Sequence, residues 1–268
     1  MKNSPPPAAL RLPVELYQGI LDHVHDRGTL STLMMTSRAL ASEAERRLYK
    51  SLYLVPGFTP QTGQLLKQLG VNSRVAGYMS SAYIDLRPHP TSSQFGELSD
   101  QVKAALEMTP NLSELTIFVE ARAALWWIPD KPPFKLRILT TNTPFDDKFI
   151  SFLNTQTHLF RAKFMTSSRN KITIPTTAMP NLRVLSTDMD TALDILPGRN
   201  VTCLQLTYVN YAPLCSTPFR SPPFDSIRRL DAPLYPSNCQ CIGLFFPKVE
   251  FLQVQFSDVS LIRPALLL

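Results

Sequence analysis

Few residues in this sequence are of the kinds that catalyse reactions or bind metal ions. Its four histidines stand at positions 23, 25, 89 and 158. His23 and His25 could chelate a metal from a strand, but on a helix a two-residue step turns their rings about 200° apart. No HExxH motif accompanies them. We interpret the pair as polar residues at a helix end and expect no metal centre there.

The four cysteines stand at positions 203, 215, 239 and 241. Cys239 and Cys241 lack the second pair that would complete a tetrahedral zinc site, unless Cys203 and Cys215 fold over them. Neither their number nor their spacing suggests a disulfide framework in a chain of this length. We therefore expect free thiols, no metal, no cofactor and a reducing compartment, cytoplasmic and/or nuclear.

Motifs for catalysis are absent as well. The hydrolase elbow G-x-S-x-G, the dinucleotide motif G-x-G-x-x-G and the phosphate loop G-x-x-x-x-G-K-[ST] do not occur, and the nine glycines are scattered. These absences predict a protein that is not an enzyme. The alternative is a small hydrolase in which a serine or cysteine lies within reach of His89 or His158.

Trp126 and Trp127 are the residues best suited to contact a target protein, because large aromatic side chains serve as interface hot spots. They belong to the apolar run from Ala123 to Ile128, the longest such run in the chain. The sequence supports equally the alternative that the pair packs in the core between two repeats.

Charge and hydropathy limit the partners. The net charge is +6, which suits an acidic partner. Basic residues stand side by side only in Arg46-Arg47 and Arg228-Arg229, without the interleaved aromatics of a single-strand binder. The pattern therefore favours an acidic protein surface and predicts no nucleic acid. No apolar run approaches the roughly 20 residues of a membrane-spanning helix, so we expect no membrane segment.

The segment 12–54 predicts three short helices. Pro13 suits a first helical turn, Gly28 supplies a stop signal, and Thr29 is a candidate cap for the second helix. Ser37 could end that helix or cap the third, and Ser42 with Glu45 fits a capping box. The apolar stripes of the three helices contain Val14, Tyr17, Ile20, Leu21, Val24, Leu30, Leu33, Met34, Leu40, Ala44 and Leu48. Three helices of about ten residues cannot bury so many large side chains, which predicts a docking module.

The same segment resembles an F-box, especially those of fungal (basidiomycete-type) F-box proteins. The resemblance is carried by Leu12-Pro13-Val14-Glu15-Leu16, Ile20-Leu21, Leu33-Met34-Met35-Thr36-Ser37-Arg38 and Glu45-Arg46-Arg47-Leu48-Tyr49. A short strand at 51–54 follows. The tryptophan common in the tail of animal F-boxes is absent, and Leu48-Tyr49 stand in its place.

This resemblance implies binding to a Skp-type adaptor and, through it, to a cullin scaffold. The adaptor contacts that it implies are Leu12, Pro13, Leu16, Ile20, Leu21, Leu30, Leu33, Met34, Ser37, Arg38, Leu48 and Tyr49. The alternative is a small helical subdomain whose apolar stripe packs on the rest of the chain.

Beyond residue 70 a short element of the form apolar-x-x-apolar-x-apolar recurs, its last part alternating like a half-buried strand. Its starts are 19 to 26 residues apart, close to the 20–29 residues of leucine-rich repeats. They are Leu112, Leu136, Leu159, Leu182, Val201, Ile227 and Val249. Prolines at 110, 180 and 247 each precede an element by two residues, where they are harmless to a strand. Helices are expected at 97–108, 146–153 and 191–196.

The resemblance here is to the leucine-rich-repeat half that commonly follows an F-box, and it departs from the standard pattern. No asparagine stands where that repeat has one after the strand; those positions are Glu120, Pro144, Ser167, Asp190, Val209, Tyr235 and Ser257. We therefore expect turns built differently and an irregular solenoid. The chain stops shortly after the last strand, at Leu268, without a polar capping segment, so we expect the sequence to be truncated or to need a partner there.

The expected fold is thus α/β: a three-helix F-box followed by an irregular leucine-rich-repeat-like α/β solenoid. Residues 1–9 are expected to be a disordered leader, 10–54 the F-box and 55–268 the repeat domain. The expected function is substrate recognition in an SCF-type cullin-RING ubiquitin ligase. The alternative is an adaptor-binding scaffold or regulatory protein outside ubiquitin transfer.

Overall fold

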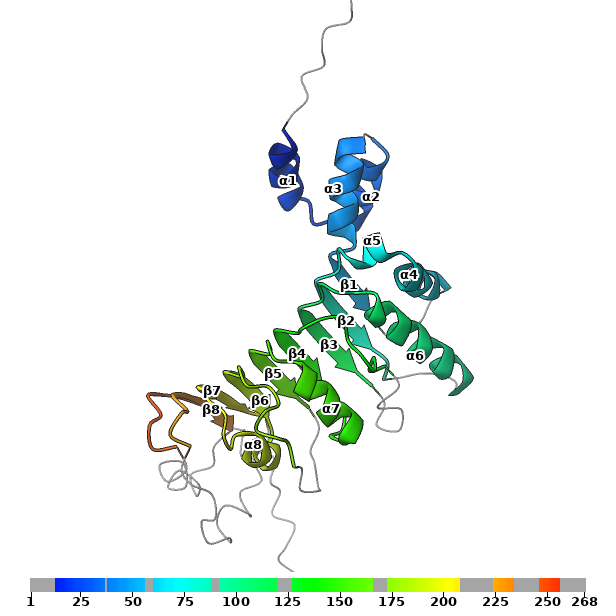
Figure 1. Ribbon diagram of the computed structural model, residues 1–268. Coiled ribbons are helices and arrows are strands. Elements are labelled where there is room, and N and C mark those ends of the chain that lie inside the picture. The colour runs from blue at the N-terminus through cyan, green and yellow to red at the C-terminus, as the bar shows by residue number, and fades with distance from the viewer. Residues whose placement is uncertain are drawn as a thin grey trace, which may run out of the picture.

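The computed structural model describes residues 13–36, 38–55, 60–87, 92–119, 127–165, 173–207, 224–233 and 246–255. Within them the chain is a mixed α/β fold built on one open sheet (Figure 1). Nine strands are hydrogen-bonded in chain order, and every neighbouring pair is parallel. The strands are β1 Ser51–Leu54, β2 Ser81–Asp85, β3 Glu114–Phe118, β4 Ile138–Thr141, β5 Arg161–Phe164, β6 Val184–Thr187, β7 Cys203–Leu206, β8 Arg229–Pro233 and β9 Phe251–Gln255. An open parallel sheet in chain order is compatible with an α/β solenoid.

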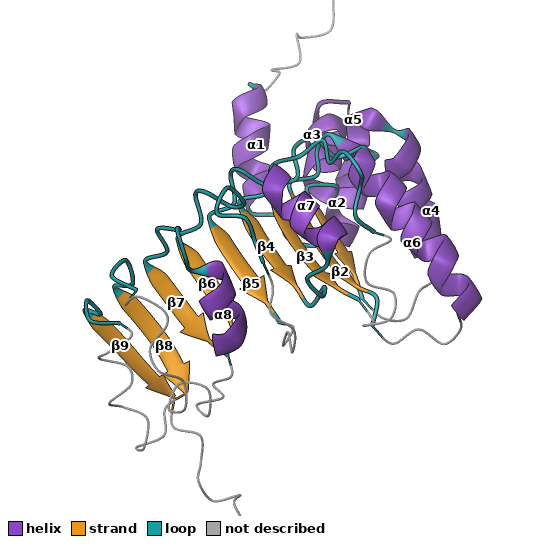
Figure 2. Cartoon of the chain, turned by 60° about the horizontal axis from the view of Figure 1, so that its bottom comes forward, coloured by secondary structure: helices purple, strands orange, loops and turns teal. Residues whose placement is uncertain are grey.

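The helices occupy two places. Three precede the sheet and gather beyond its β1 end (Figure 1); they are α1 Val14–Asp22, α2 Arg27–Met34 and α3 Arg38–Leu48. The others lie between strands, and the longer of them cover one face of the sheet (Figure 2). They are α4 Pro60–Val71, α5 Ser73–Ala76, α6 Ser92–Glu107, α7 Asp147–Thr155 and α8 Met189–Ile195.

One column of apolar residues runs through every strand because the register never shifts. Its members are Leu52, Ala82, Leu115, Leu139, Ala162, Leu185, Leu204, Leu230 and Leu252. The first eight are at most 6% exposed, whereas Leu252 on the terminal strand is 45% exposed. Full burial of a leucine stabilises a fold by about 1.5–3 kcal/mol, so this column contributes a large share of the core.

A second repeated feature lies at the point where each strand begins. The carbonyl oxygen of Lys50 accepts hydrogen bonds from the backbone N–H groups of Ser80 and Ser81, at 2.9 and 3.2 Å. The same two-donor arrangement recurs at every later strand junction. The acceptors there are the carbonyls of Ser80, Ser113, Arg137, Phe160, Arg183, Thr202 and Arg228. Each strand entry is therefore fixed to the preceding repeat.

The seven predicted strand starts are confirmed, because each precedes one of the strands β3 to β9 by two residues. Two further copies of the pattern were missed. They start at Tyr49, ahead of Leu52 and Leu54, and at Met79, ahead of Ala82 and Ile84. The intervals to the next start are 30 and 33 residues, longer than those expected, because α4 and α5 occupy the first interval and α6 the second.

Three predicted helices correspond to α6, α7 and α8, whereas α4 and α5 were not predicted. The residues predicted to end α1 and to cap α2 are wrong. Gly28 lies inside the helix rather than ending α1, and Asp26 is the cap, its carboxylate accepting a 2.6 Å hydrogen bond from the N–H of Thr29. Ser42 likewise lies inside α3, which begins at Arg38. Strand 51–54, assigned above to the F-box region, is β1 of the sheet, so the helical part ends at Leu48.

Asparagines do brace neighbouring repeats, although not at the positions inspected in the sequence. Asn142, directly after β4, donates to the carbonyl of Val119 and accepts from its N–H group, both at 2.8 Å. At the other end of the strands Asn111 donates to the carbonyl of Gly77 at 2.7 Å. Asn181 donates likewise to the carbonyl of Thr157, at 2.9 Å. These asparagines stand at positions other than that of the standard repeat, in line with the expectation of turns built differently.

The core column yields a test of the fold. Leu185→Ala should lower the free energy of unfolding by about 2–5 kcal/mol, because it leaves a cavity in a fully buried site. Leu252→Ala, in the same column but half exposed, should cost less than half as much. Urea denaturation of both variants measures the difference, and equal losses would contradict the continuous column.

Candidate docking site

Helices α1, α2 and α3 form a cluster with a very small core of their own. Leu21, Leu30 and Ala44 are its buried apolar residues in the described part, at 0%, 5% and 0% exposure. The apolar side chains packed around them are only partly buried: Val24, Leu33, Met34, Leu40 and Leu48. So small a core contributes little stability, and the cluster depends on its polar ties and on its neighbours.

One side of α1 presents apolar residues to solvent. Leu16 is 50% exposed and Ile20 is 52% exposed, and Pro13 at the start of the helix is also exposed. Residues three, four and seven apart lie on the same side of a helix, so these three side chains form one stripe. We call Pro13, Leu16 and Ile20 the α1 face. An apolar stripe of this kind on a weakly packed helix is suited to binding a partner.

Ion pairs hold the cluster together and leave the α1 face free. Arg47 on α3 pairs with Asp22 at the end of α1. Glu43, one turn earlier on α3, pairs with Arg46 and lies 3.9 Å from Arg47. This arrangement attaches α1 to α3 through charged side chains at the end of α1, away from its apolar stripe.

The cluster is joined directly to the sheet. Glu45 on α3 accepts two hydrogen bonds from the guanidinium of Arg74 on α5, at 2.6 and 2.8 Å. Arg27 on α2 donates to the carbonyl of Ser51 in β1, at 2.8 Å. Tyr49 packs against the main core. These contacts position the α1 face at the β1 end of the sheet.

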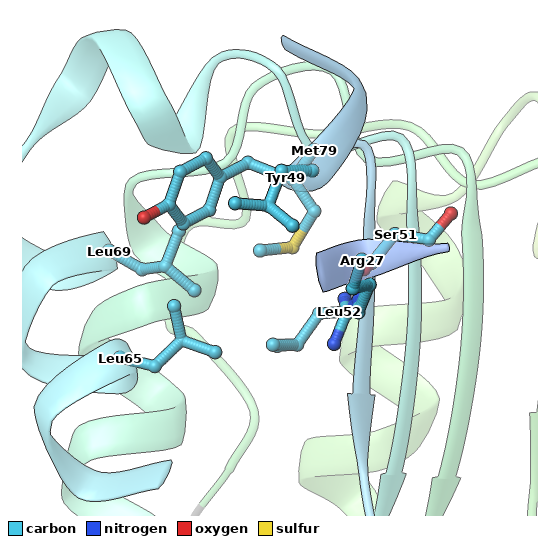
Figure 3. A pocket seen from close by; sticks show the side chains of 8 residues that line it. Arg27, Tyr49, Ser51, Leu52, Leu65, Leu69 and Met79 are labelled. Carbon is cyan, nitrogen blue, oxygen red and sulfur yellow. The ribbon is translucent and has the colours of Figure 1, made fainter. Parts of the chain in front are cut away.

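A hollow of about 190 Å³ lies at this junction (Figure 3). Leu65 and Leu69 of α4 line one side, and Leu52 of β1 lies across from them (Figure 3). The complete lining is Arg27, Leu48, Tyr49, Ser51, Leu52, Leu65, Leu69 and Met79. The volume is below the roughly 300–1,000 Å³ of typical small-molecule sites, and it suits a single apolar side chain.

The structure separates the residues expected to contact the adaptor into three groups. Pro13, Leu16, Ile20 and Arg38 are exposed, and Leu33, Met34, Leu48 and Tyr49 are partly buried. Leu21 and Leu30 are buried in the core of the cluster, so they do not face solvent in this conformation, and their contact with a partner stays a prediction. Leu12 and Ser37 lie outside the described residues.

Two residues of this region were missed by the sequence reasoning as site residues. Met35, 87% exposed at the end of α2, was quoted only as part of the motif. No sequence pattern pointed to Arg27, because its hydrogen bond to Ser51 joins residues 24 positions apart and depends on the fold.

The sheet face opposite the helices carries a second candidate surface. At its β1 end, Tyr53 and Tyr83 stack with ring centroids 4.7 Å apart, and Tyr83 meets Phe118 edge-on at 6.0 Å. The guanidinium of Arg87 lies 4.6 Å from the centroid of Phe118 and pairs with Asp85. Further along, exposed or half-exposed basic residues occupy this face at positions 161, 163 and 229.

Trp127 is a core residue in this conformation, where its side chain is not accessible to a target protein. Its side chain is 1% exposed and packs edge-on against Phe152, with ring centroids 5.8 Å apart. This position agrees with the packing alternative, because the ring belongs to the main core and contacts Phe152 of α7. Trp126 lies outside the described residues.

The structure shows no assembled catalytic or metal site in the part of the chain that it describes. His158 is exposed in the turn before β5, and His89 lies outside the described residues, as do Cys215, Cys239 and Cys241. Cys203 is a free thiol. The described ranges contain no group of three or more acidic, histidine or cysteine side chains able to hold a metal ion. Nor do they contain a helix with the length and hydropathy to cross a membrane.

No model of a known protein family matches the chain, and no curated protein shows significant similarity to it.

Trp127 provides a test of the core assignment. Trp127→Ala should lower the free energy of unfolding by about 3–5 kcal/mol, because a fully buried ring is removed. Thermal denaturation followed by circular dichroism measures the loss. An unchanged melting temperature would contradict the buried position.

Asp85 gives a pH test of the sheet face. Two hydrogen bonds from the Arg87 side chain, at 3.0 and 2.6 Å, lower the pKa of the Asp85 carboxyl below its usual value. The pair therefore stabilises the fold above the unfolded pKa, and this stabilisation is lost as the pH falls through the lower folded pKa. Carboxyl NMR titration should show the pKa of Asp85 rising in Arg87→Met; an unchanged pKa would contradict the pairing.

Proposed function

We propose that this chain is a substrate-recognition subunit of an SCF-type cullin-RING ubiquitin ligase. In this proposal α1 to α3 are an F-box that docks on a Skp-type adaptor, and the sheet carries a leucine-rich-repeat-like surface for a target protein. The observation that carries the proposal is the exposed α1 face on a helical cluster whose own core is very small. The resemblance of segment 12–54 to F-boxes supplies the identity of the partner.

The α1 face offers the adaptor an apolar stripe that water now covers. Leu16 and Ile20 are each half exposed, so burying the remainder contributes about 1 kcal/mol per side chain. Two such residues do not make an interface, but they suit the apolar centre of one, and the exposed Glu15 and Gln18 on the same helix offer polar groups around them.

The chain performs no chemistry in this proposal. Its contribution is proximity: a target held on the sheet is presented to a ubiquitin-charged enzyme carried by the cullin, which raises the effective concentration of its lysines. The pair Glu45–Arg74 and the bond from Arg27 to Ser51 support this role. They join the docking cluster to the sheet, so that a bound target keeps a defined position relative to the adaptor.

A second candidate function is an adaptor-binding scaffold or regulator outside ubiquitin transfer. It uses the same α1 face and differs only in the absence of a cullin from the assembly. In either case we propose that the protein acts in the cytoplasm or the nucleus, without a cofactor.

The α1 face can be tested directly. The double variant Leu16→Asp, Ile20→Asp should lose co-purification with a Skp-type adaptor, because two carboxylates would be buried at the interface. Circular dichroism should show the fold unchanged, because both residues are half exposed. The matched control is Val71→Asp, an 83% exposed apolar residue on α4, which should bind as the unaltered chain does. Undiminished adaptor binding by the double variant would contradict the proposal.

The two candidate functions differ in one measurement. The chain, the adaptor and a cullin should elute as one species in size-exclusion chromatography if the chain is a ligase subunit. Elution of the chain with the adaptor alone, while the cullin remains separate, would instead favour the scaffold or regulator.

A further inference from the structure

The sheet face opposite the helices has an uneven distribution of charge and aromatic rings. One outward position, the first residue of each strand, is occupied by Ser51, Ser81, Glu114, Ile138, Arg161, Val184, Cys203, Arg229 and Phe251, which the register aligns in one row. The next outward row includes Tyr53 and Tyr83 at one end and Lys163 on β5. The stacked tyrosines therefore lie at the β1 end, whereas the basic residues lie between β5 and β8, with Phe251 beside Arg229.

The basic residues are not neutralised by neighbours. In the ranges that the structure describes, no carboxylate lies within 4.0 Å of Arg161 or Lys163, whereas Arg74 and Arg87 are both paired. Arg229 is exposed, and its guanidinium lies 4.7 Å from the ring centroid of Phe251. Exposed cations held on a rigid sheet attract an anionic partner.

Their spacing matches an extended polypeptide. Arg161 on β5 and Arg229 on β8 occupy the same row three strands apart, which is about 14 Å at ~4.8 Å per strand. An extended chain advances ~3.3 Å per residue, so residues four apart span ~13 Å and point to the same side. Tyr83 on β2 lies another three strands beyond Arg161, in the neighbouring outward row that also holds Lys163. Anchors at intervals of about four residues therefore fit all three positions.

We propose that this face binds an extended acidic segment of a target protein that crosses the strands. Two carboxylates four residues apart pair with Arg161 and Arg229, with Lys163 beside the first, and an aromatic or aliphatic side chain four residues further on packs against Tyr53 and Tyr83. This inference rests on the proposed function, and it names the class of target that the receptor takes.

Charge on this face favours an acidic peptide over a nucleic acid. Glu114 and Asp231 lie on the same face, the latter accepting a 3.1 Å hydrogen bond from Gln205. Protein carboxylates that lie among the cations repel a nucleic acid, because its phosphate backbone is continuously charged. A peptide with spaced carboxylates can place its charges on the arginines and away from Glu114 and Asp231. The stacked tyrosines also lie apart from the cations rather than between them, unlike a single-strand stacking platform.

The experiment uses the full chain and fluorescein-labelled peptides in fluorescence anisotropy. The probe is a nine-residue Ser/Thr peptide with glutamate at its first and fifth positions and tyrosine at its ninth. A second peptide has lysine in place of both glutamates. The acidic peptide should bind at least tenfold more tightly than the lysine peptide, and its affinity should fall as NaCl is raised from about 50 to about 500 mM.

Variants decide which surface is responsible. Arg161→Glu with Arg229→Glu should weaken the acidic peptide at least tenfold. The matched control is Lys67→Glu with Lys131→Glu, two exposed lysines in α4 and in the segment before β4. It changes the net charge equally and should bind as the unaltered chain does. Equal weakening in both variants, or equal binding of the two peptides, would overturn the proposal.

Two further measurements separate the alternatives. A labelled dT12 oligonucleotide that binds more tightly than the acidic peptide and is lost in the Arg161, Arg229 variant would overturn the peptide assignment in favour of nucleic acid. Adaptor binding by the same variant should be unchanged, since both residues lie away from the α1 face. The acidic-peptide proposal can therefore fail while the adaptor proposal stands, and the adaptor proposal can fail while peptide binding is observed.

Discussion

The unshifted register of the parallel sheet is the constraint on which the rest of the structure depends. Side chains alternate between the two faces of a strand, so a slip of one residue would move every core residue to the solvent face. Two-donor bonds to the carbonyls of residues such as Lys50, Ser113 and Arg183 fix each strand entry against the preceding repeat. The same register that aligns the buried leucines also aligns Arg161 and Arg229 in one outward row. The core and the proposed binding surface thus follow from one pattern of backbone hydrogen bonds.

The helical cluster is built on the opposite principle, with a small core and many polar ties. Among the described apolar side chains of the cluster, Leu21, Leu30 and Ala44 are the buried ones, and Leu16 and Ile20 of α1 stay half exposed. Its attachment depends on charged contacts, chiefly between Arg47 and Asp22 and between Glu45 and Arg74. A weakly packed helix with an exposed apolar stripe lowers the stability of the free chain. Binding of the proposed partner would cover that stripe.

The strands were largely predictable from the sequence, because alternation survives wherever one face of a strand is buried. Copies at Tyr49 and Met79 were missed because helices lengthen the intervals around them, and the period alone does not reveal insertions. Thr29 and Asp26 are both suitable N-cap residues for α2. Only the hydrogen bond from the N–H of Thr29 to the Asp26 carboxylate shows that Asp26 is the cap.

The candidate site was less predictable than the strands. Segment 12–54 indicated an apolar surface, yet burial alone separates Leu21 from Ile20, since both belong to the same predicted stripe. Trp127 could equally have been a contact or a core residue, because its size suits both. The most direct measurement is amide hydrogen exchange of the full chain with and without a Skp-type adaptor. The account predicts slower exchange in α1 and α2 and no change in β5 to β8, whereas protection confined to the sheet, or no protection at all, would contradict it.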